Sequence, residues 1–324
     1  MSAGRLTLLA LAIAACLVAG LAVGTVPLSV ADVWRGLTRP DAPASAIVRD
    51  LRAPRVLLAF CVGGSLAVCG AALQAMIRNP LAEPYLLGLS GGAGLGAVLA
   101  IATHAAAPWA VPIAAFLGAL AAVAMVYRLS LVAGRRLDPR VLLLSGVVVG
   151  SFAGALMSAI IVLSPAPEVR NAFLWLLGGF GSASWQSLAV FSAYAVLPLA
   201  VVAVRARSLD LLALGDETAH HLGADVERTR RLVYVCTALL TAASVATCGI
   251  IGFVGLVVPH AVRTVARPLH GTLLPLVFGV GGAFLVLSDV VSRTVVRPLE
   301  LPVGVITALV GVPLFAVLLR RSLA

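Results

Sequence analysis

Lysine is missing from this 324-residue sequence, in which all 23 basic residues are arginine. Its absence excludes a P-loop lysine, a Schiff-base lysine and a lysine general base. Charge of either sign is also scarce, because Asp, Glu, Lys and Arg make up 11% of the residues, against about 25% in a typical soluble domain. The composition therefore excludes an ordinary soluble protein and indicates that lipid surrounds most of the chain.

Cysteine is present but carries no recognisable pattern. The five cysteines all lie inside apolar runs, their number is odd and no C-x-x-C spacing occurs. A metal or redox site is the functional interpretation, whereas small buried apolar side chains are the more ordinary one. We assign no metal site and no catalytic role to Cys16, Cys61, Cys69, Cys236 and Cys248.

Apolar side chains fill the space that charge leaves, since 61% of the residues are hydrophobic. A membrane-spanning helix needs about 20 apolar residues, so the chain has room for roughly ten crossings and for no separate soluble domain. We expect one polytopic membrane domain over residues 1–324. Apolar runs occupy residues 6–26, 56–77, 86–103, 107–127, 141–163, 185–204, 232–262, 273–291 and 301–319.

The run between Arg231 and Arg263 is too long for one crossing. A helix over residues 232–262 would extend about 46 Å, whereas the hydrocarbon core is about 30 Å thick. Breaks are expected at its glycines and at Pro259, which gives two crossings. Two crossings also place most interhelical arginines on one side, the cytoplasm. The sequence therefore predicts an all-α integral membrane protein with ten helices and both termini in the cytoplasm.

The arginines account for a net charge of +10, which by itself is also typical of nucleic-acid binding. They lie between apolar segments instead of forming one stripe, so we expect no nucleic-acid partner. Residues 27–55, expected outside, nevertheless carry five arginines against the usual bias. Residues 205–231, expected inside, form short amphipathic turns. These turns indicate either a docking surface for a partner or helices that lie on lipid.

The segment around Ser90 matches a catalytic pattern. Residues 88–92 have the G-x-S-x-G spacing of a nucleophile elbow, and His260 could supply a base for an intramembrane serine protease. The elbow requires a strand, a turn and a helix, but Ser90 follows a proline-marked bend and opens a glycine-rich apolar segment. Close helix packing also explains these glycines. We keep the protease only as a remote alternative.

A second pattern of small residues lies in the fifth expected helix. Gly146, Gly150, Gly154 and Ser158 recur every four residues and so share one helix face. This stripe is either a packing face for another helix or the wall of a wide pathway. The sequence leaves both interpretations open.

Ionisable side chains within apolar runs are functional candidates, because burying charge in lipid is costly. Asp289 lies four residues before Arg293, which predicts an i,i+4 ion pair. We expect His260 to be a hydrogen-bonded structural histidine. A proton relay needs a chain of such groups, and none is visible. This argues against a proton-coupled carrier, which, like a channel, would work without a nucleotide-binding partner.

Several stretches together resemble the permease subunit of type II ABC importers, the family that takes up iron-siderophores, haem and cobalamin. They occur in family order over almost the whole chain. They are residues 51–55 (LRAPR), Cys69, Gly70, Gln74, residues 79–84 (NPLAEP), Leu87, Gly88, residues 175–178 with Trp185, residues 215–217 with Leu222 and Gly223, residues 249–260 with Arg263, residues 301–304 and residues 311–313.

The resemblance implies a homodimer in the bacterial inner membrane, two ATPase subunits that carry ATP and Mg²⁺, and a periplasmic binding protein. The chain itself would be a transport subunit without a cofactor. ATP would move the coupling helices, and the fifth helices of the two protomers would rock to alternate access. The cargo would be a bulky iron chelate, which we rank as haem first, then a ferric siderophore, then cobalamin.

The resemblance also implies roles for single residues. Asn79 and Leu81 match one cytoplasmic gate, and Glu83 and Pro84 would hold the turn into the next helix. The second gate usually has small polar residues, whereas this chain has Asp138, Pro139 and Arg140. The coupling region would be about residues 208–231, with docking at Gly215, Asp216, Glu217, Ala219, Leu222 and Gly223. Binding-protein docking would fall to Arg52, Arg55, Arg293 and Arg297.

Overall fold

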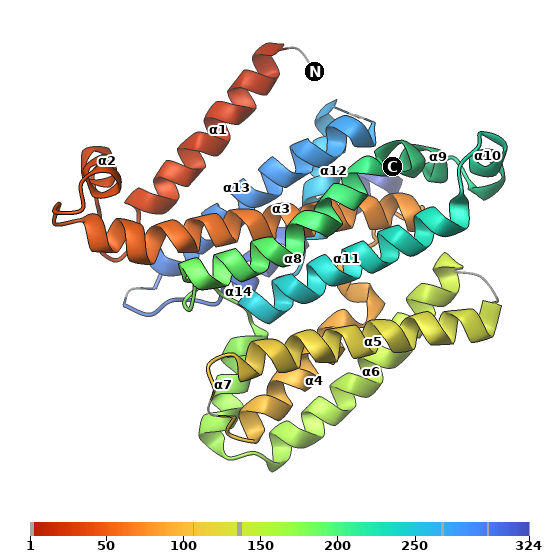
Figure 1. Ribbon diagram of the computed structural model, residues 1–324, viewed down its shortest axis with the longest axis horizontal. Coiled ribbons are helices and arrows are strands. Elements are labelled where there is room, and N and C mark those ends of the chain that lie inside the picture. The colour runs from red at the N-terminus through yellow and green to blue at the C-terminus, as the bar shows by residue number, and fades with distance from the viewer. Residues whose placement is uncertain (1–2, 106, 135–137, 267–268, 297, 324) are drawn as a thin grey trace.

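The computed structural model describes all residues except 1–2, 106, 135–137, 267–268, 297 and 324, and its regular elements in the described part are all helices (Figure 1). Within the described residues, seven helices are long and apolar enough to cross a membrane: α1 (Ala3–Ala22), α3 (Ala53–Ile77), α5 (Ala110–Gly134), α6 (Pro139–Leu163), α8 (Trp185–Val204), α11 (Val226–Cys248) and α13 (His270–Thr294). Shorter apolar helices are α4 (Leu89–Ala102), α12 (Val254–Ala266) and α14 (Val303–Leu323). The remaining helices are α2 (Val30–Thr38), α7 (Ala166–Leu176), α9 (Ala206–Ala213), α10 (Asp216–His221), the π-helix η1 (Ile47–Arg52) and the 3₁₀ turn η2 (Pro84–Leu87).

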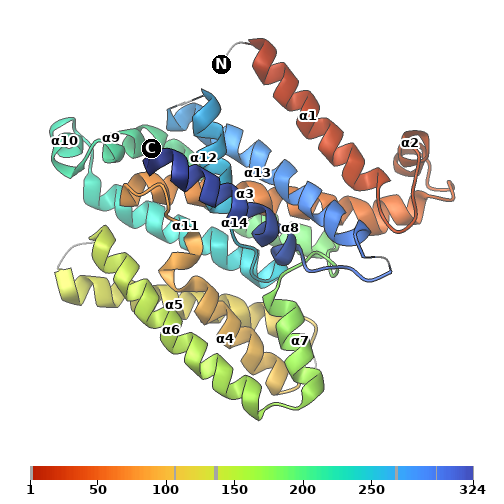
Figure 2. The ribbon, with the colours of Figure 1, turned by 180° about the vertical axis from the view of Figure 1, so that it is seen from behind.

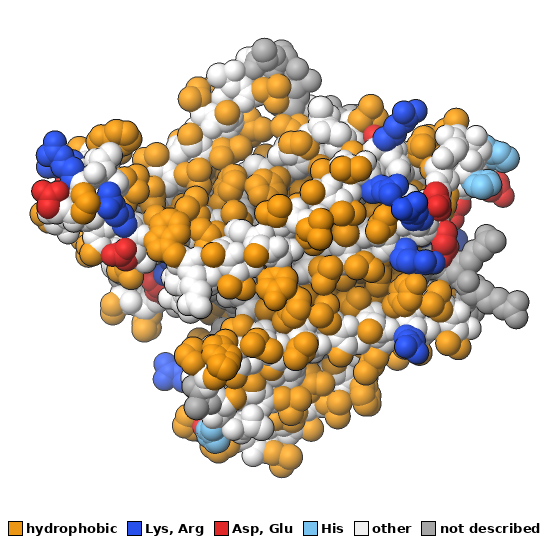
Figure 3. Space-filling view, in the orientation of Figure 1, with side chains coloured by type: hydrophobic (Ala, Val, Ile, Leu, Met, Phe, Trp, Pro, Cys, Tyr) orange, Lys and Arg blue, Asp and Glu red, His pale blue; other side chains and the backbone are white. Residues whose placement is uncertain are grey.

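The long helices share one general direction, and charge gathers where they end. In Figures 1 and 2, α3, α8, α11, α5 and α6 run between an end marked by α2 and an end marked by α10. Figure 3 shows arginine and acidic side chains clustered at these two ends and a broad hydrophobic band between them. We call them the α2 end and the α10 end. This distribution confirms the membrane class, because a lipid-facing surface must be apolar between two polar edges.

Helix α3 is the centre of the molecule, and most of its residues are buried. Its glycines let neighbouring backbones approach closely. A Cβ at Gly63 would overlap the carbonyl oxygen of Gly281 in α13, and one at Gly70 would overlap that of Gly255 in α12. Small residues at such crossings replace the hydrophobic driving force that lipid does not supply.

The long apolar run breaks as predicted, between α11 and α12. Helix α11 ends at Cys248, and Gly249 takes a positive φ of 73°, which favours glycine. A Cβ there would also overlap the carbonyl oxygen of Trp175. Pro259, in contrast, lies inside α12 and does not end it. We call residues 249–253 the break.

Helices α4, α5 and α6 form a second group along the lower side of the molecule in Figures 1 and 2. A Cβ at Gly92 in α4 would overlap the carbonyl oxygen of Gly118 in α5, and Gly96 meets Ala114 in the same way. Tyr234 of α11 joins this group to the rest, because its hydroxyl donates to the carbonyl of Val123 at 3.0 Å.

Candidate functional site

The predicted gate residues follow α3 at the α10 end. Arg78 ends α3 in a left-handed conformation with φ of 55°. The Asn79 side-chain oxygen then accepts from the Leu81 amide at 2.9 Å, which fixes a tight turn. The Leu81 side chain is 40% exposed. We call residues 78–88 the gate segment, and its role as a gate stays a prediction.

The gate segment is tied to the break by polar contacts. Glu83 accepts from the Phe253 amide at 2.6 Å, and the Tyr85 hydroxyl accepts from the Ile251 amide at 3.3 Å. Gln74, one turn before the gate segment, donates to the carbonyl of Gly255 at 3.2 Å. Because α12 begins at Val254, Glu83 and Tyr85 accept from unpaired amides ahead of its first turn, whereas Gln74 donates to a carbonyl inside that turn. Glu83 therefore holds the start of α12, besides preceding the η2 turn that was predicted.

Glu83 lies between α3 and α4 in a partly buried position. Burial raises the pKa of its carboxyl group, and the Phe253 amide acts in the opposite direction by stabilising the charged form. The preference of this carboxyl for its proton is thus set by the packing of the gate segment against the break.

The start of α4 is a packing surface. The element that precedes Ser90 is a 3₁₀ turn and not a strand. A Cβ at Gly88 would lie 3.0 Å from the carbonyl oxygen of Gly146, and one at Gly91 would lie 2.8 Å from that of Gly150. The glycines around Ser90 therefore have a structural reason, namely close contact with α6.

The small-residue stripe of α6 divides into two halves. A Cβ at Gly146 would overlap the carbonyl of Leu86, and one at Gly150 would lie 3.5 Å from the Cα of Gly88. Nothing lies within 4 Å of a Cβ at Gly154, and Ser158 is exposed. The half nearer the α10 end is a packing face against the gate segment, and the other half faces outward.

The second predicted gate position is the beginning of α6. Asp138 is its N-cap, and its side chain accepts from the Arg140 amide at 2.8 Å. Pro139 occupies the first helical position, where a missing amide costs nothing. The departure from small polar residues thus has a local role in starting the helix. The side chain of Arg140 is exposed.

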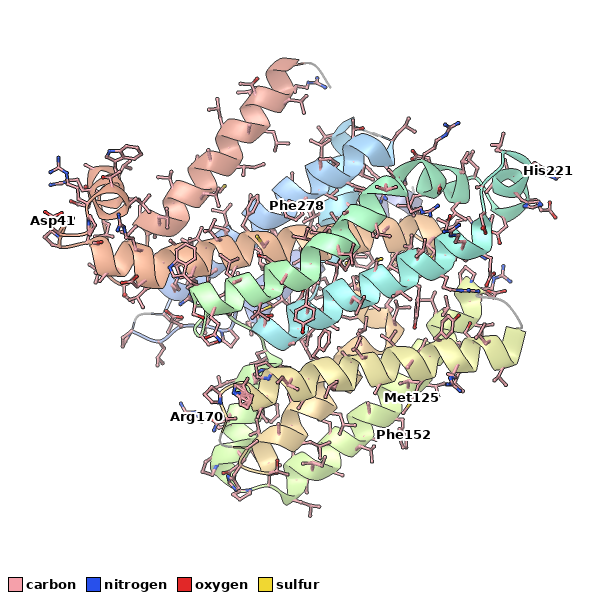
Figure 4. The ribbon with its side chains drawn as sticks, in the orientation of Figure 1. Asp41, Met125, Phe152, Arg170, His221 and Phe278 are labelled. Carbon is pink, nitrogen blue, oxygen red and sulfur yellow. The ribbon has the colours of Figure 1, made fainter. Side chains whose placement is uncertain are left out.

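The predicted coupling residues form a protruding corner made of α9 and α10. Figure 4 labels His221 at its tip. Gly215 and Gly223, with φ of 114° and 83°, flank α10 at positions that only glycine adopts easily. Glu217 is exposed and Leu222 is 58% exposed, whereas Ala219 is buried against the chain itself. The corner therefore presents Glu217 and Leu222 outward, and Ala219 supports it from inside.

Asp216, in the same corner, is half-exposed and lies between two arginines. Its Oδ1 atom lies 2.7 Å from Nη2 of Arg230 in α11 and 4.0 Å from Nη2 of Arg78. Sequence reasoning named Asp216 but neither arginine as its partner. No sequence signal joins residues this far apart, although the position of Arg78 directly before the gate turn was a usable hint.

Three of the four arginines predicted to dock a binding protein, Arg52, Arg55 and Arg293, lie at the α2 end and turn inward. Arg52 is 6% exposed and donates to the carbonyls of Leu21 and Ala22 at 2.7 and 2.9 Å, and also to that of Val26. It thereby pairs carbonyls that the end of α1 leaves free. Arg293 is 4% exposed. Arg297 lies outside the described residues.

A buried ion cluster contains Arg55 and Arg293. Asp289 pairs with Arg55 at 2.9 Å and with Arg293 at 3.0 Å, which confirms the predicted i,i+4 pair. Arg55 also meets Glu300 at 2.8 Å, and Glu300 is 41% exposed. Only the edge of Arg55 reaches the surface in this conformation, and Glu300 covers it. Docking by these arginines stays a prediction.

Comparison with known proteins gives this arrangement a context. Residues 10–321 match the model of the FecCD transport family. Among curated relatives, the chain is 45% identical to the cobalamin import system permease protein BtuC of Halobacterium salinarum over 277 residues, which are 86% of this chain and 74% of the relative. It is 38% identical to the hemin transport system permease protein HmuU of Yersinia pestis over 306 residues, covering 93% and 90%.

A third relative, the Fe(3+)-citrate import system permease protein YfmD of Bacillus subtilis, is 37% identical over 308 residues, again covering 93% and 90%. A solved structure described as an inward-facing conformation of a metal-chelate type ABC transporter superimposes with a TM-score of 0.88 at 30% identity, and covers 99% of this chain and 100% of its own. The chain therefore belongs to the FecCD transport family, the permeases of type II ABC importers.

Proposed function

We propose that this chain is the membrane subunit of an ATP-driven importer, which works as a homodimer with two ATPase subunits and a periplasmic binding protein. The main support for this proposal is the family match over residues 10–321, together with a fold that superimposes on that of the metal-chelate type ABC transporter over 99% of the chain. The seven long and three shorter apolar helices support ten crossings. In this arrangement α4 and α12 are the shorter crossings, and the irregular gate segment and break that precede them are enclosed by protein.

The orientation follows from arginine. The α10 end carries the arginines of α9 and of the first turns of α11, so we place it in the cytoplasm and the α2 end in the periplasm. The end of α14 lies beside α9 in both ribbon views, which supports a cytoplasmic C-terminus. The coupling corner then faces the ATPase, and the gate segment lies on the same side.

For the cargo, we propose a metal tetrapyrrole, that is haem or cobalamin. The sequence-based ranking put haem first, whereas the relatives order the cargoes differently, because the cobalamin permease shares 45% identity and the hemin permease 38%. Both cargoes are large metal-centred macrocycles, so the class has more support than either member. Ferric citrate, the cargo named for a relative at 37%, is the comparison cargo.

The test begins with the tagged chain purified from the membranes of its source. An ABC ATPase should copurify, and the complex in nanodiscs should hydrolyse ATP. In proteoliposomes that also contain the binding protein, uptake of haem or cyanocobalamin should require ATP and exceed uptake of ferric citrate. ATP-independent uptake by the chain alone would instead identify a channel or a carrier. Loss of a proteolytic activity in Ser90→Ala would identify the protease, and unaltered uptake in that variant would exclude it.

A further inference from the structure

The coupling corner and the gate segment touch each other through Arg78. Besides the 4.0 Å approach to Asp216, the Arg78 guanidinium lies directly over Gly215, where a Cβ would come within 3.2 Å of Nη1. Arg78 is also the first residue of the gate segment, immediately before the Asn79 turn. A side chain at the base of the predicted gate therefore rests on the first residues of the predicted coupling corner.

Asp216 holds its two arginines unequally. Its contact with Arg230 is short at 2.7 Å, and the Arg230 side chain is 7% exposed, so this pair fixes the corner to α11. The contact with Arg78 is longer, and the two side chains are 47% and 43% exposed. Half-exposed ion pairs contribute about 0–1 kcal/mol and rearrange easily. Asp216 is thus anchored on one side and adjustable on the other.

The Arg78 side chain is not needed to end α3. The cap is made by the backbone, because the Arg78 amide lies within hydrogen-bond reach of the carbonyls of Ala75 and Gln74. The left-handed conformation at this position does not call for an arginine either, because its steric cost falls on the backbone and Cβ of any residue other than glycine. The guanidinium of Arg78 therefore plays no part in capping α3. Its position over Gly215 and beside Asp216 must have another explanation.

We propose that Arg78 is a positioning residue that transmits movement of the coupling corner to the inner gate. The inference rests on the proposed function. When the ATPase displaces the α10 corner, Asp216 and Gly215 push or release Arg78, and Arg78 carries the gate turn at Asn79 with it. The contact of Glu83 with the Phe253 amide then extends the movement to the break and to α12.

The experiment follows the gate by thiol labelling. Leu81→Cys places a thiol at a 40% exposed position, in a chain whose five native cysteines are replaced by serine. The complex with its copurified ATPase is treated with a charged maleimide, with and without ATP and vanadate. With Arg78 present, nucleotide should change the labelling rate. With Arg78→Gln, ATP hydrolysis should persist and the nucleotide-dependent change should be lost, whereas Arg78→Lys should retain it.

Arg231→Gln is the matched control, because Arg231 is an exposed arginine of the same end that pairs with Glu227 at 3.5 Å. It should keep both hydrolysis and the labelling response. If Arg78→Gln does not assemble, Arg78→Met removes the same charge without touching the Asp216–Arg230 pair and should give the same loss. A response that survives in Arg78→Gln, or in Arg78→Met, would overturn the inference. A parent complex that fails to hydrolyse ATP would instead count against the proposed function.

Discussion

Two carboxylates, one toward each end of the molecule, are held in opposite ways. Asp289 near the α2 end is 1% exposed and lies between two arginines, at 2.9 Å from Arg55 and 3.0 Å from Arg293. Glu83 near the α10 end accepts from the Phe253 amide at 2.6 Å, and no ion pair is found for it within the described part of the chain. Asp289 thus neutralises buried guanidinium groups, whereas Glu83 accepts a hydrogen bond from a backbone amide.

The difference teaches where the fold is fixed and where it can rearrange. Breaking the Asp289 contacts would leave the buried guanidinium of Arg293 without its carboxylate and that of Arg55 with only the half-exposed Glu300, which is costly. Releasing Glu83 would free one amide and return a carboxylate toward water, which the ionised form prefers. The α2 end therefore behaves as a clamp between α3 and α13, and the gate segment is attached by contacts that one conformational step can exchange.

The largest expected effect tests the clamp. Asp289→Ala leaves Arg293 buried without its carboxylate partner and leaves Arg55 with Glu300 alone, so it should destabilise the protein by about 3–5 kcal/mol. Thermal unfolding of the purified chain in detergent would show this as a large fall in Tm. Glu227→Ala removes an exposed i,i+4 pair with Arg231 and should cost at most about 0.5 kcal/mol. Similar shifts in the two variants would contradict the contrast between the two ends.

Much of this fold could be predicted from local pattern. Length and charge gave the break near Gly249, and spacing gave the Asp289–Arg293 pair, because both depend on residues close in sequence. The contacts of Glu83 with Phe253 and of Asp216 with Arg78 join segments far apart in the sequence, and the first lies beside the close crossing of α3 and α12 at Gly70 and Gly255. Hydrophobic periodicity along the sequence does not predict such tertiary contacts. For the same reason, the inward turn of Arg52 was missed, since its partners are backbone carbonyls.

An effect of intermediate size is expected at Glu300, which covers the exposed edge of Arg55 at the α2 end. Glu300→Gln removes the outer of the two carboxylates on Arg55, and because Glu300 is 41% exposed, stability should change by about 1 kcal/mol or less. If Arg55 docks the binding protein, its freed edge should be captured more readily by acidic groups of that partner. Half-maximal stimulation of ATP hydrolysis should then need less binding protein. An unchanged requirement would count against docking at Arg55.

The smallest effect has the opposite sign and concerns Glu83. Burial raises the pKa of this carboxyl above its ordinary value of about 4.5, so the folded chain holds the proton more tightly than the unfolded one. The resulting stability is fully present below the ordinary pKa and is lost as pH rises through the raised pKa. Glu83→Gln keeps an acceptor for the Phe253 amide but never ionises.

The Tm of Glu83→Gln relative to the parent should therefore rise between pH 4.5 and neutrality. Glu227→Gln, at an exposed position of α11, serves as the control and should show no comparable rise. If the Tm of the parent and the Tm of Glu83→Gln change in parallel with pH, ionisation of Glu83 does not destabilise the folded chain. A relative rise would show that the ionised Glu83 carboxylate destabilises the gate segment. The clamp behaves in the opposite way, because it depends on the ionised Asp289 carboxylate. Removing the negative charge should therefore stabilise the protein at Glu83 and destabilise it at Asp289.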